Sequence, residues 1–118
     1  MATVLLVDDD PRLLDALAAL VESDGFHAIK ALNGAQALRC ARAERPAIVV
    51  TDYMMPVMDG ETLIRALARD PGLAGVPVVL SSAVAAAPGR LPVAAFLRKP
   101  FPAARLLELL HQYTAPGS

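Results

Sequence analysis

The chain has 118 residues, about the length of one domain, and 55% of them are hydrophobic while 19% are charged. This composition supports a buried core and excludes a disordered tail. Eleven Lys and Arg residues against twelve Asp and Glu residues give a net charge of −1, so the chain lacks the basic excess that direct nucleic-acid binding requires.

Short apolar segments rich in β-branched residues predict strands, and segments with helical spacing lie between them. In chain order the predicted elements are a strand at Thr3–Val7, a helix at Pro11–Ser23, a strand at Phe26–Ala31, a helix at Asn33–Glu44, a strand at Ala47–Thr51, a helix from Asp59 to Asp70, strands at Val76–Leu80 and Val93–Leu97, and a helix at Pro102–Tyr113. Three of the strands are apolar almost throughout, which is typical of parallel strands buried on both faces. The alternation predicts a doubly wound parallel sheet.

Polar residues mark the helix starts. Asp10 precedes Pro11, a pairing that suits an N-cap followed by the first helical position, and Asn33 and Asp59 are similar caps. For Asp10 and Asp59 we expect this capping role rather than a part in any site. Residues 1–113 are predicted to form one domain, and residues 114–118 a C-terminal tail.

The connection between the last two predicted strands is short. Only Ala83–Pro92 separates Ser82 from the strand at Val93, and this stretch contains Pro88 and Gly89. A parallel crossover with its helix takes at least about 10–12 residues, and proline and glycine end helices. The helix that would be fourth in chain order is therefore expected to be shortened or missing.

Single-residue counts exclude several kinds of site. One cysteine, Cys40, rules out an internal disulfide and, with only two histidines, a Cys/His zinc site.

The apolar runs fall far short of the roughly 20 residues that span a bilayer. The N-terminus lacks the basic and apolar regions of a signal peptide. We therefore expect a cytoplasmic protein that does not contact a membrane.

Chemically active residues collect where the predicted strands end. Asp8 and Asp9 follow the first strand, Asp52 follows the third, Ser82 follows the fourth and Lys99 follows the fifth. In open α/β sheets, ligands bind outside the carboxyl ends of the strands. Three close carboxylates repel one another, and a hard divalent cation such as Mg²⁺ relieves this repulsion. Together with a lysine and a hydroxyl group, they suggest phosphoryl transfer to an aspartate.

Four segments carry a family resemblance: VLLVDDDP, TDYMMPVMDG, VPVVLSSA and FLRKPF, in this order. Together they resemble the response-regulator receiver domain of two-component signalling, of the chemotaxis-regulator type, over essentially the whole chain. The resemblance implies a flavodoxin-like fold of five parallel strands with helices on both faces. It also implies that Asp52 accepts the phosphoryl group and that Asp8, Asp9, Asp52 and the backbone carbonyl of Met54 hold Mg²⁺.

The same resemblance assigns roles near the phosphoryl group. Lys99 and Ser82 would hold its oxygens, with Ser82 as the switch hydroxyl, and the Lys99–Pro100 peptide bond would be cis. Phe96 takes the place of the switch aromatic, although plain core packing is an open alternative. Ser81 is expected to be structural, because side chains alternate along a strand and only one of two adjacent serines can face the site.

The implied function is a phosphorylation-switched signalling module rather than an enzyme, with only weak self-phosphorylation and self-dephosphorylation. A histidine kinase or histidine phosphotransfer protein would donate the phosphoryl group, and an output domain or partner protein would respond. Without a full fourth helix, we expect a monomer or an atypical dimer.

Two other functions are weighed against this one. The first is an aspartyl-phosphate hydrolase of the haloacid-dehalogenase type, because Asp8 and Asp10 have the spacing of its two acids. No substrate-covering cap fits in 118 residues, however. The second is an inert pseudo-receiver that only binds proteins, against which the complete set of Asp52, Ser82 and Lys99 argues.

Overall fold

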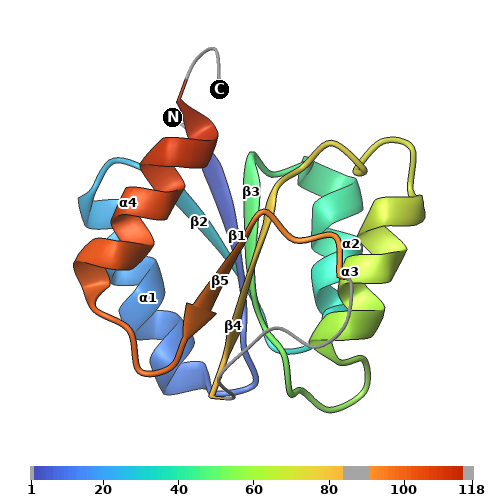
Figure 1. Ribbon diagram of the computed structural model, residues 1–118, viewed down its shortest axis with the longest axis horizontal. Helices are drawn as coiled ribbons and strands as arrows, with labels where there is room; N and C mark the ends of the chain where they lie inside the picture. Colours follow the sequence, from blue (N-terminus) through green and yellow to red (C-terminus); the bar gives the residue numbers. More distant parts are fainter. Residues whose placement is uncertain (1, 84–90, 116–118) are drawn as a thin grey trace.

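The computed structural model describes residues 2–83 and 91–115, over which five strands and four helices are present (Figure 1). In chain order they are β1 (Thr3–Val7), α1 (Pro11–Ser23), β2 (His27–Ala31), α2 (Gly34–Glu44), β3 (Ile48–Asp52), α3 (Gly60–Arg69), β4 (Val78–Ser82), β5 (Ala95–Arg98) and α4 (Ala103–Thr114). Each strand and helix expected from the sequence periodicity is found here.

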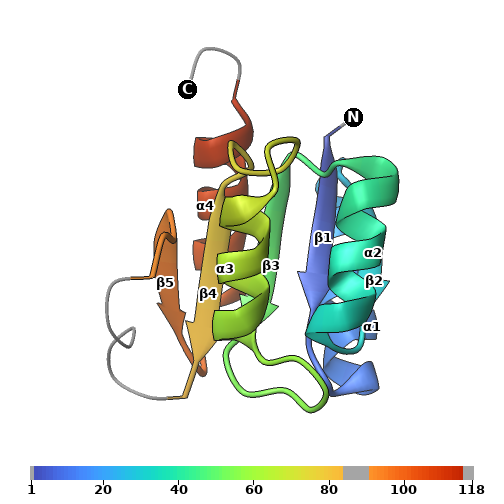
Figure 2. The same cartoon turned by 90° about the vertical axis from the view of Figure 1, so that its right-hand side faces the viewer.

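The strands form one parallel sheet in the order β2-β1-β3-β4-β5. Helices α1 and α4 cover one face of the sheet, and α2 and α3 cover the other (Figures 1 and 2). The predicted flavodoxin-like, doubly wound sheet is therefore confirmed. The chain moves outward from β1 to β2 and then returns to β3 on the opposite side of β1. The switch point of the sheet consequently lies between the carboxyl ends of β1 and β3.

Alternate residues of the central strands enter two hydrophobic cores, one on each face. Val4 and Leu6 of β1 pack in the core beneath α1 and α4, whereas Leu5 and Val7 pack in the core beneath α2 and α3. Successive side chains of a strand point to opposite faces, so the next residue, Asp8, belongs to the α1–α4 side.

The predicted caps are present at three helix starts. The Asp10 side chain accepts hydrogen bonds from the first turn of α1, Asn33 caps α2 and Asp59 caps α3. The hydrogen bond from the backbone N–H of Thr62 lowers the pKa of Asp59 below its usual value. Short polar side chains thus fix where each helix begins, close to the strand ends that precede them.

Three strands end later than the apolar pattern predicts. The predicted strands stop at Thr51, Leu80 and Leu97, whereas β3, β4 and β5 continue to Asp52, Ser82 and Arg98. The apolar runs stop at the first polar side chain, but the ladder continues through the pairs Asp52 with Ser81 and Ser82 with Arg98. The polar strand ends are therefore held in the regular sheet.

The prediction for the fourth helix concerns residues that lie mostly outside the described part of the chain. Ala83 and residues 91–94, which flank the gap, are not helical, and the described residues contain no helix between β4 and β5. For residues 84–90 the shortened helix stays a prediction. At the C-terminus, α4 extends through Thr114, one residue beyond the predicted end, and residues 116–118 also lie outside the description.

Candidate functional site

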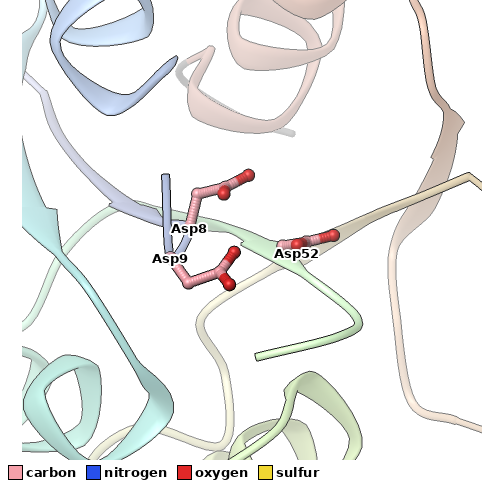
Figure 3. A group of neighbouring side chains, drawn as sticks. All are labelled: Asp8, Asp9 and Asp52. Atoms are coloured by element: carbon pink, nitrogen blue, oxygen red, sulfur yellow. The ribbon is translucent and has the colours of Figure 1, made fainter. Parts of the chain in front are cut away.

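Three carboxylates meet at the switch point of the sheet. Asp8 and Asp9 directly follow β1, and Asp52 is the last residue of β3, which pairs with β1. One oxygen from each carboxylate lies within 4.8 Å of the other two (Figure 3). Asp8 is buried, Asp52 is partly buried and Asp9 is exposed to solvent. The structure thus brings together the three acids that the sequence analysis grouped.

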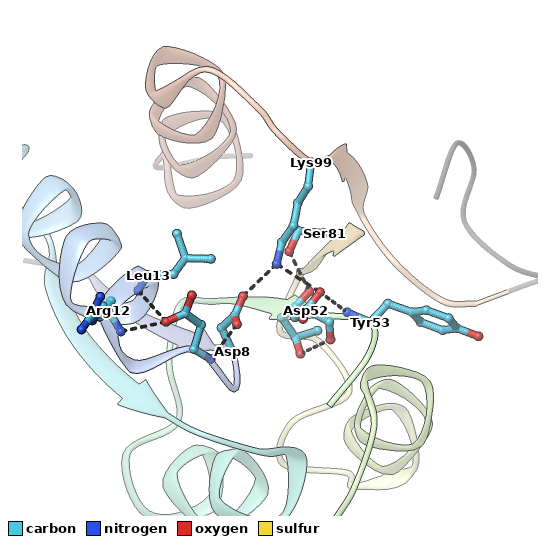
Figure 4. A network of polar contacts seen from close by, with 9 residues as sticks. Asp8, Arg12, Leu13, Asp52, Tyr53, Ser81 and Lys99 are labelled. Atoms are coloured by element: carbon cyan, nitrogen blue, oxygen red, sulfur yellow. Dashed lines mark hydrogen bonds and ion pairs between the residues drawn. The ribbon is translucent and has the colours of Figure 1, made fainter. Parts of the chain in front are cut away.

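Lys99 brings an ammonium group to this cluster from the edge of the sheet. Its Nζ atom lies 2.9 Å from Oδ2 of Asp8 and 3.3 Å from Oδ1 of Asp52 (Figure 4). Lys99 follows β5, so its side chain extends past the end of β4 to reach β3 and β1. The Lys99–Pro100 peptide bond is cis, as the sequence resemblance implied. Sequence reasoning placed Lys99 against a phosphoryl group and missed Asp8 as its resting partner.

The ionisation of this cluster follows from burial and from the neighbouring charges. Burial raises the pKa of Asp52; the Lys99 ammonium opposes this shift and the Asp8 carboxylate adds to it. Burial alone would lower the pKa of Lys99, but its hydrogen bonds and ion pairs with Asp8 and Asp52 outweigh that effect and raise it. Lys99 is therefore a permanent cation at neutral pH.

The charges and donor atoms of the cluster fit a hard divalent cation. Three carboxylates face one ammonium group, which leaves an excess of negative charge when all are ionised. The donor atoms are carboxylate oxygens, which Mg²⁺ and similar ions prefer, and the exposed carboxylate of Asp9 opens the cluster to solvent. Asp8, Asp9 and Asp52 are therefore the residues that would hold Mg²⁺.

The loop after β3 is fixed closely against Asp52. The N–H of Tyr53 donates to Oδ1 of Asp52 at 2.9 Å, and the N–H of Gly60 donates to the carbonyl of Tyr53 at 2.9 Å. A Cβ atom on Gly60 would lie 2.4 Å from the carbonyl oxygen of Asp52, so only glycine permits α3 to start at this distance from β3. Met54 lies in the same loop with 69% of its surface exposed. The part of its carbonyl in metal binding stays a prediction.

Two buried serines end β4, and their contacts differ. Ser81 is paired with Asp52 in the β3–β4 register, and its hydroxyl donates to the carbonyl of Thr51 at 3.4 Å. The carbonyl of Ser82 accepts the N–H of Lys99 at 2.8 Å. The switch role of the Ser82 hydroxyl stays a prediction. The hydrogen bond to Thr51 is consistent with the structural role expected for Ser81, and the register pairs this residue with Asp52.

Phe96 of β5 is partly buried and packs against the core beneath α2 and α3. This contact corresponds to the core-packing alternative for Phe96, and its role as a switch aromatic stays a prediction.

Comparison with known proteins identifies one family. The family model described as "Response regulator receiver domain" matches residues 4–111. Protein PilH of Pseudomonas aeruginosa is 36% identical over 80 residues, which cover 68% of this chain and 66% of PilH. The DNA-binding response regulator MtrA of Mycolicibacterium smegmatis is 39% identical over 80 residues, which cover 68% of this chain. That alignment spans only 34% of the length of MtrA.

Solved structures show the same fold. The chemotaxis response regulator CheY4 of Vibrio cholerae superimposes with a TM-score of 0.88 at 24% identity, over 96% of this chain and 98% of CheY4. The receiver domain of the sensor histidine kinase PA1611 from Pseudomonas aeruginosa has a TM-score of 0.88 at 27% identity, over 96% of this chain and 97% of that domain. That structure contains a magnesium ion coordinated in the active site cleft.

Mg²⁺ should stabilise the folded protein because it relieves the repulsion among Asp8, Asp9 and Asp52. At saturating metal the free energy of unfolding should rise by about 1–3 kcal/mol, and EDTA should reverse the gain. Thermal melts across a Mg²⁺ titration measure this effect. Asp9→Asn should weaken it, whereas Asp59→Asn, outside the cluster, should not. A melting temperature that is independent of Mg²⁺ would contradict the cation site.

Without metal, Asp52→Asn should stabilise the protein. A carboxyl group whose pKa is raised on folding contributes most to stability when protonated, and this contribution is lost as the pH rises through the folded-state pKa. At pH 7 the variant should therefore melt higher, by roughly 2–6 °C, the effect of about 1 kcal/mol in a domain of this size. Below about pH 4 the gain should disappear, because wild-type Asp52 is then protonated in both states.

Asp59→Asn provides a control of opposite sign for that experiment. The pKa of Asp59 is lowered on folding, so its charge contributes stability above the unfolded-state pKa, and this is lost as the pH falls through the folded-state pKa. Asparagine still caps a helix. The variant should melt lower than wild type at pH 7 and converge with it in acid. If Asp52→Asn also melts lower at pH 7 without metal, the argument about Asp52 is wrong.

Proposed function

The chain belongs to the response regulator receiver domain family, and from this premise we propose that it is a phosphorylation-switched signalling module with Asp52 as phosphoacceptor. The donor is a histidine kinase or a histidine phosphotransfer protein, and Mg²⁺ is the cofactor. The convergence of Asp8, Asp9, Asp52 and Lys99 at one edge of the sheet is the observation that carries this proposal.

Asp52 is the nucleophile in the proposed reaction. A carboxylate oxygen forms a bond to phosphorus while the bond from phosphorus to the imidazole nitrogen of the donor breaks. The electron pair of that bond stays on the imidazole, which takes up a proton. When bound, Mg²⁺ would supply positive charge to the transferred phosphoryl group. Asp8 and Asp9 would hold it close to Asp52.

Lys99 and Ser82 stabilise the transferred group. The Lys99 ammonium lies 3.3 Å from Oδ1 of Asp52, within reach of a phosphoryl group attached there. Ser82 donates a hydrogen bond to another phosphoryl oxygen. Phe96, as the switch aromatic, rotates when that hydrogen bond forms. These roles follow the family pattern at matching positions of this chain, and the burial of Ser82 at the end of β4 supports them.

An apolar groove beside Lys99 provides a docking surface for the protein donor. The groove has a volume of 520 Å³ and is lined by α1 and by the segment between β5 and α4. Leu13, Leu17 and Leu20 line it from α1, and Phe101 lines it from the segment between β5 and α4. An apolar surface that borders Lys99, the ammonium partner of Asp52, suits a helical donor that must present its histidine to Asp52.

The hydrolase alternative is less consistent with these contacts. Its second acid would be Asp10, but the Asp10 side chain accepts hydrogen bonds from the N–H groups of Arg12 and Leu13 at 3.0 and 3.4 Å. Asp10 therefore caps α1. The pseudo-receiver alternative does not explain why three acids and one lysine are grouped at one site.

The cellular setting and the output of the module are part of the same proposal. Among the residues that the structure describes, no helix is long and apolar enough to cross a membrane. We place the module, residues 1–113, in the cytoplasm, as a monomer or atypical dimer. Its net charge of −1 disfavours direct nucleic-acid binding, so we assign the output to a partner protein or an attached domain.

Acetyl phosphate with Mg²⁺ should phosphorylate Asp52, since the site supplies both positioning and charge neutralisation. Intact-mass spectrometry should detect one added phosphoryl group, and peptide mapping should locate it on Asp52. EDTA and Asp52→Asn should each abolish it, and no turnover of phosphate monoesters is expected. Phosphorylation that persists in Asp52→Asn would refute Asp52 as the acceptor, and phosphorylation that persists in EDTA would refute the metal requirement.

The phosphoryl group should be lost slowly from wild type. A polar side chain two residues beyond Asp52 or two residues beyond Ser82 could orient a hydrolytic water. These positions hold Met54 and Val84, which are both apolar, and Val84 lies outside the described residues. Met54→Asn should shorten the half-life of the phosphorylated protein by roughly three- to tenfold. Val57→Asn, in the same exposed loop, is the matched control and should retain the wild-type half-life. Equal or slower loss in Met54→Asn would refute the argument.

A substitution in the apolar groove should slow phosphoryl transfer from protein donors and leave transfer from small-molecule donors unchanged. Leu13 lines the groove and is absent from both hydrophobic cores, so Leu13→Gln should alter docking with little loss of stability. Transfer from a cognate phosphotransfer protein should slow by about tenfold, the effect of roughly 1.4 kcal/mol of lost apolar contact, while phosphorylation by acetyl phosphate stays unchanged. Ala19→Gln, on the exposed side of α1, is the control. If Leu13→Gln leaves protein-to-protein transfer intact, the donor docks elsewhere.

A further inference from the structure

A second buried hydroxyl lies on the same side of the sheet as the acidic cluster. Val50 of β3 and Val79 of β4 pack in the core beneath α1 and α4. Two residues further along each strand, Asp52 and Ser81 return to that side. The β3–β4 register pairs these two residues directly. Ser81 therefore neighbours the carboxylate of Asp52 on the adjacent strand.

The side chain of Lys99 passes over this position. The β4–β5 register pairs Ser81 with Leu97, and Lys99 lies two residues beyond Leu97 on the same side. To bring Nζ within 3.3 Å of Asp52 on β3, Lys99 must cross β4, and Ser81 is the β4 residue paired with Asp52. In this structure the Ser81 hydroxyl is bonded to the carbonyl of Thr51, and no dashed line joins it to the Lys99 amine (Figure 4).

Ser81 has spare capacity to accept a hydrogen bond at this place. Its side chain is buried, with 4% of the residue exposed, and its hydroxyl donates to the carbonyl of Thr51 at 3.4 Å. That distance is long for an O–H···O bond, which is usually about 2.7–2.8 Å. The proton goes to Thr51, so the lone pairs of Oγ are available as acceptors.

The ammonium group of Lys99 has a proton available for a further hydrogen-bond acceptor. It carries three protons, and its carboxylate partners are Asp8 and Asp52. The proposed function requires both carboxylates to hold a cation, which competes with Lys99 for the same oxygens. Lys99 must then stay over Asp52 without its full set of resting partners.

We propose that Ser81 is a positioning residue for Lys99. Its Oγ atom accepts a proton of the Lys99 ammonium and keeps that group over Asp52 while the carboxylates are engaged with the cation. This inference rests on the proposed function of Asp52 as phosphoacceptor. Ser81 touches neither the phosphoryl group nor the metal, and it acts only through Lys99.

The direct test measures the hydrogen-exchange rate of the Lys99 ammonium group by ¹⁵N NMR. The sample is unphosphorylated protein saturated with Mg²⁺. In Ser81→Ala the exchange rate should increase by about fivefold, as expected for loss of one hydrogen bond. Ser81→Thr, which keeps the hydroxyl, should restore slow exchange. Ser23→Ala, at the exposed end of α1 and away from the site, should leave the Lys99 exchange rate at the wild-type value. An unchanged exchange rate in Ser81→Ala would overturn the proposal.

A second measurement links Ser81 to the chemistry. With phosphoramidate and saturating Mg²⁺, Ser81→Ala should be phosphorylated about fivefold more slowly than wild type, while its Mg²⁺ affinity stays unchanged. A merely structural serine would leave both the phosphorylation rate and the Lys99 exchange unchanged, which would overturn the proposal. If wild type itself is not phosphorylated on Asp52, the proposed function fails, whereas the exchange result still decides whether Ser81 holds Lys99.

Discussion

The repulsion among three carboxylates that share one ammonium partner is the constraint on which the rest of the site depends. Asp8, Asp9 and Asp52 stand within 4.8 Å of one another, and Lys99 offsets only part of their charge. Burial of Asp52 adds to this cost by raising its pKa. An arrangement of this kind persists only where the surrounding fold is strong enough to hold it, and it prepares the site for a positively charged ligand.

The fold supplies that strength through its two cores and its strand ladder. The residues just before the cluster, Leu6 and Val7 of β1 and Val50 of β3, are buried in those cores. The ladder carries β3 and β4 through their polar ends, so Asp52 sits on a strand rather than on a loop. Gly60 lets α3 approach the same backbone. The acids are therefore held on rigid elements at the switch point, where a ligand can enter from solvent.

Much of this arrangement follows from the sequence, since apolar runs, caps and polar strand ends are local signals. The periodicity predicts each described strand and helix, and Asp10, Asn33 and Asp59 predict where three helices begin. The polar residues at strand ends predict that the acids meet. Two features depend on long-range geometry instead. The preference of Lys99 for Asp8 depends on how a flexible side chain crosses two strands, and the position of Ser81 depends on a register that no apolar pattern encodes.

The central claim is that Asp52, a divalent cation and Lys99 act as one phosphoryl-binding unit, and beryllofluoride tests it most directly. This anion imitates a phosphoryl group on a carboxylate, and ¹⁹F NMR reports when it is bound. With Mg²⁺ present, wild type should show bound fluorine resonances, and these should be absent with EDTA or in Asp52→Asn and weaker in Lys99→Ala. Failure of wild type to bind beryllofluoride with Mg²⁺, or binding that persists in Asp52→Asn, would contradict the account.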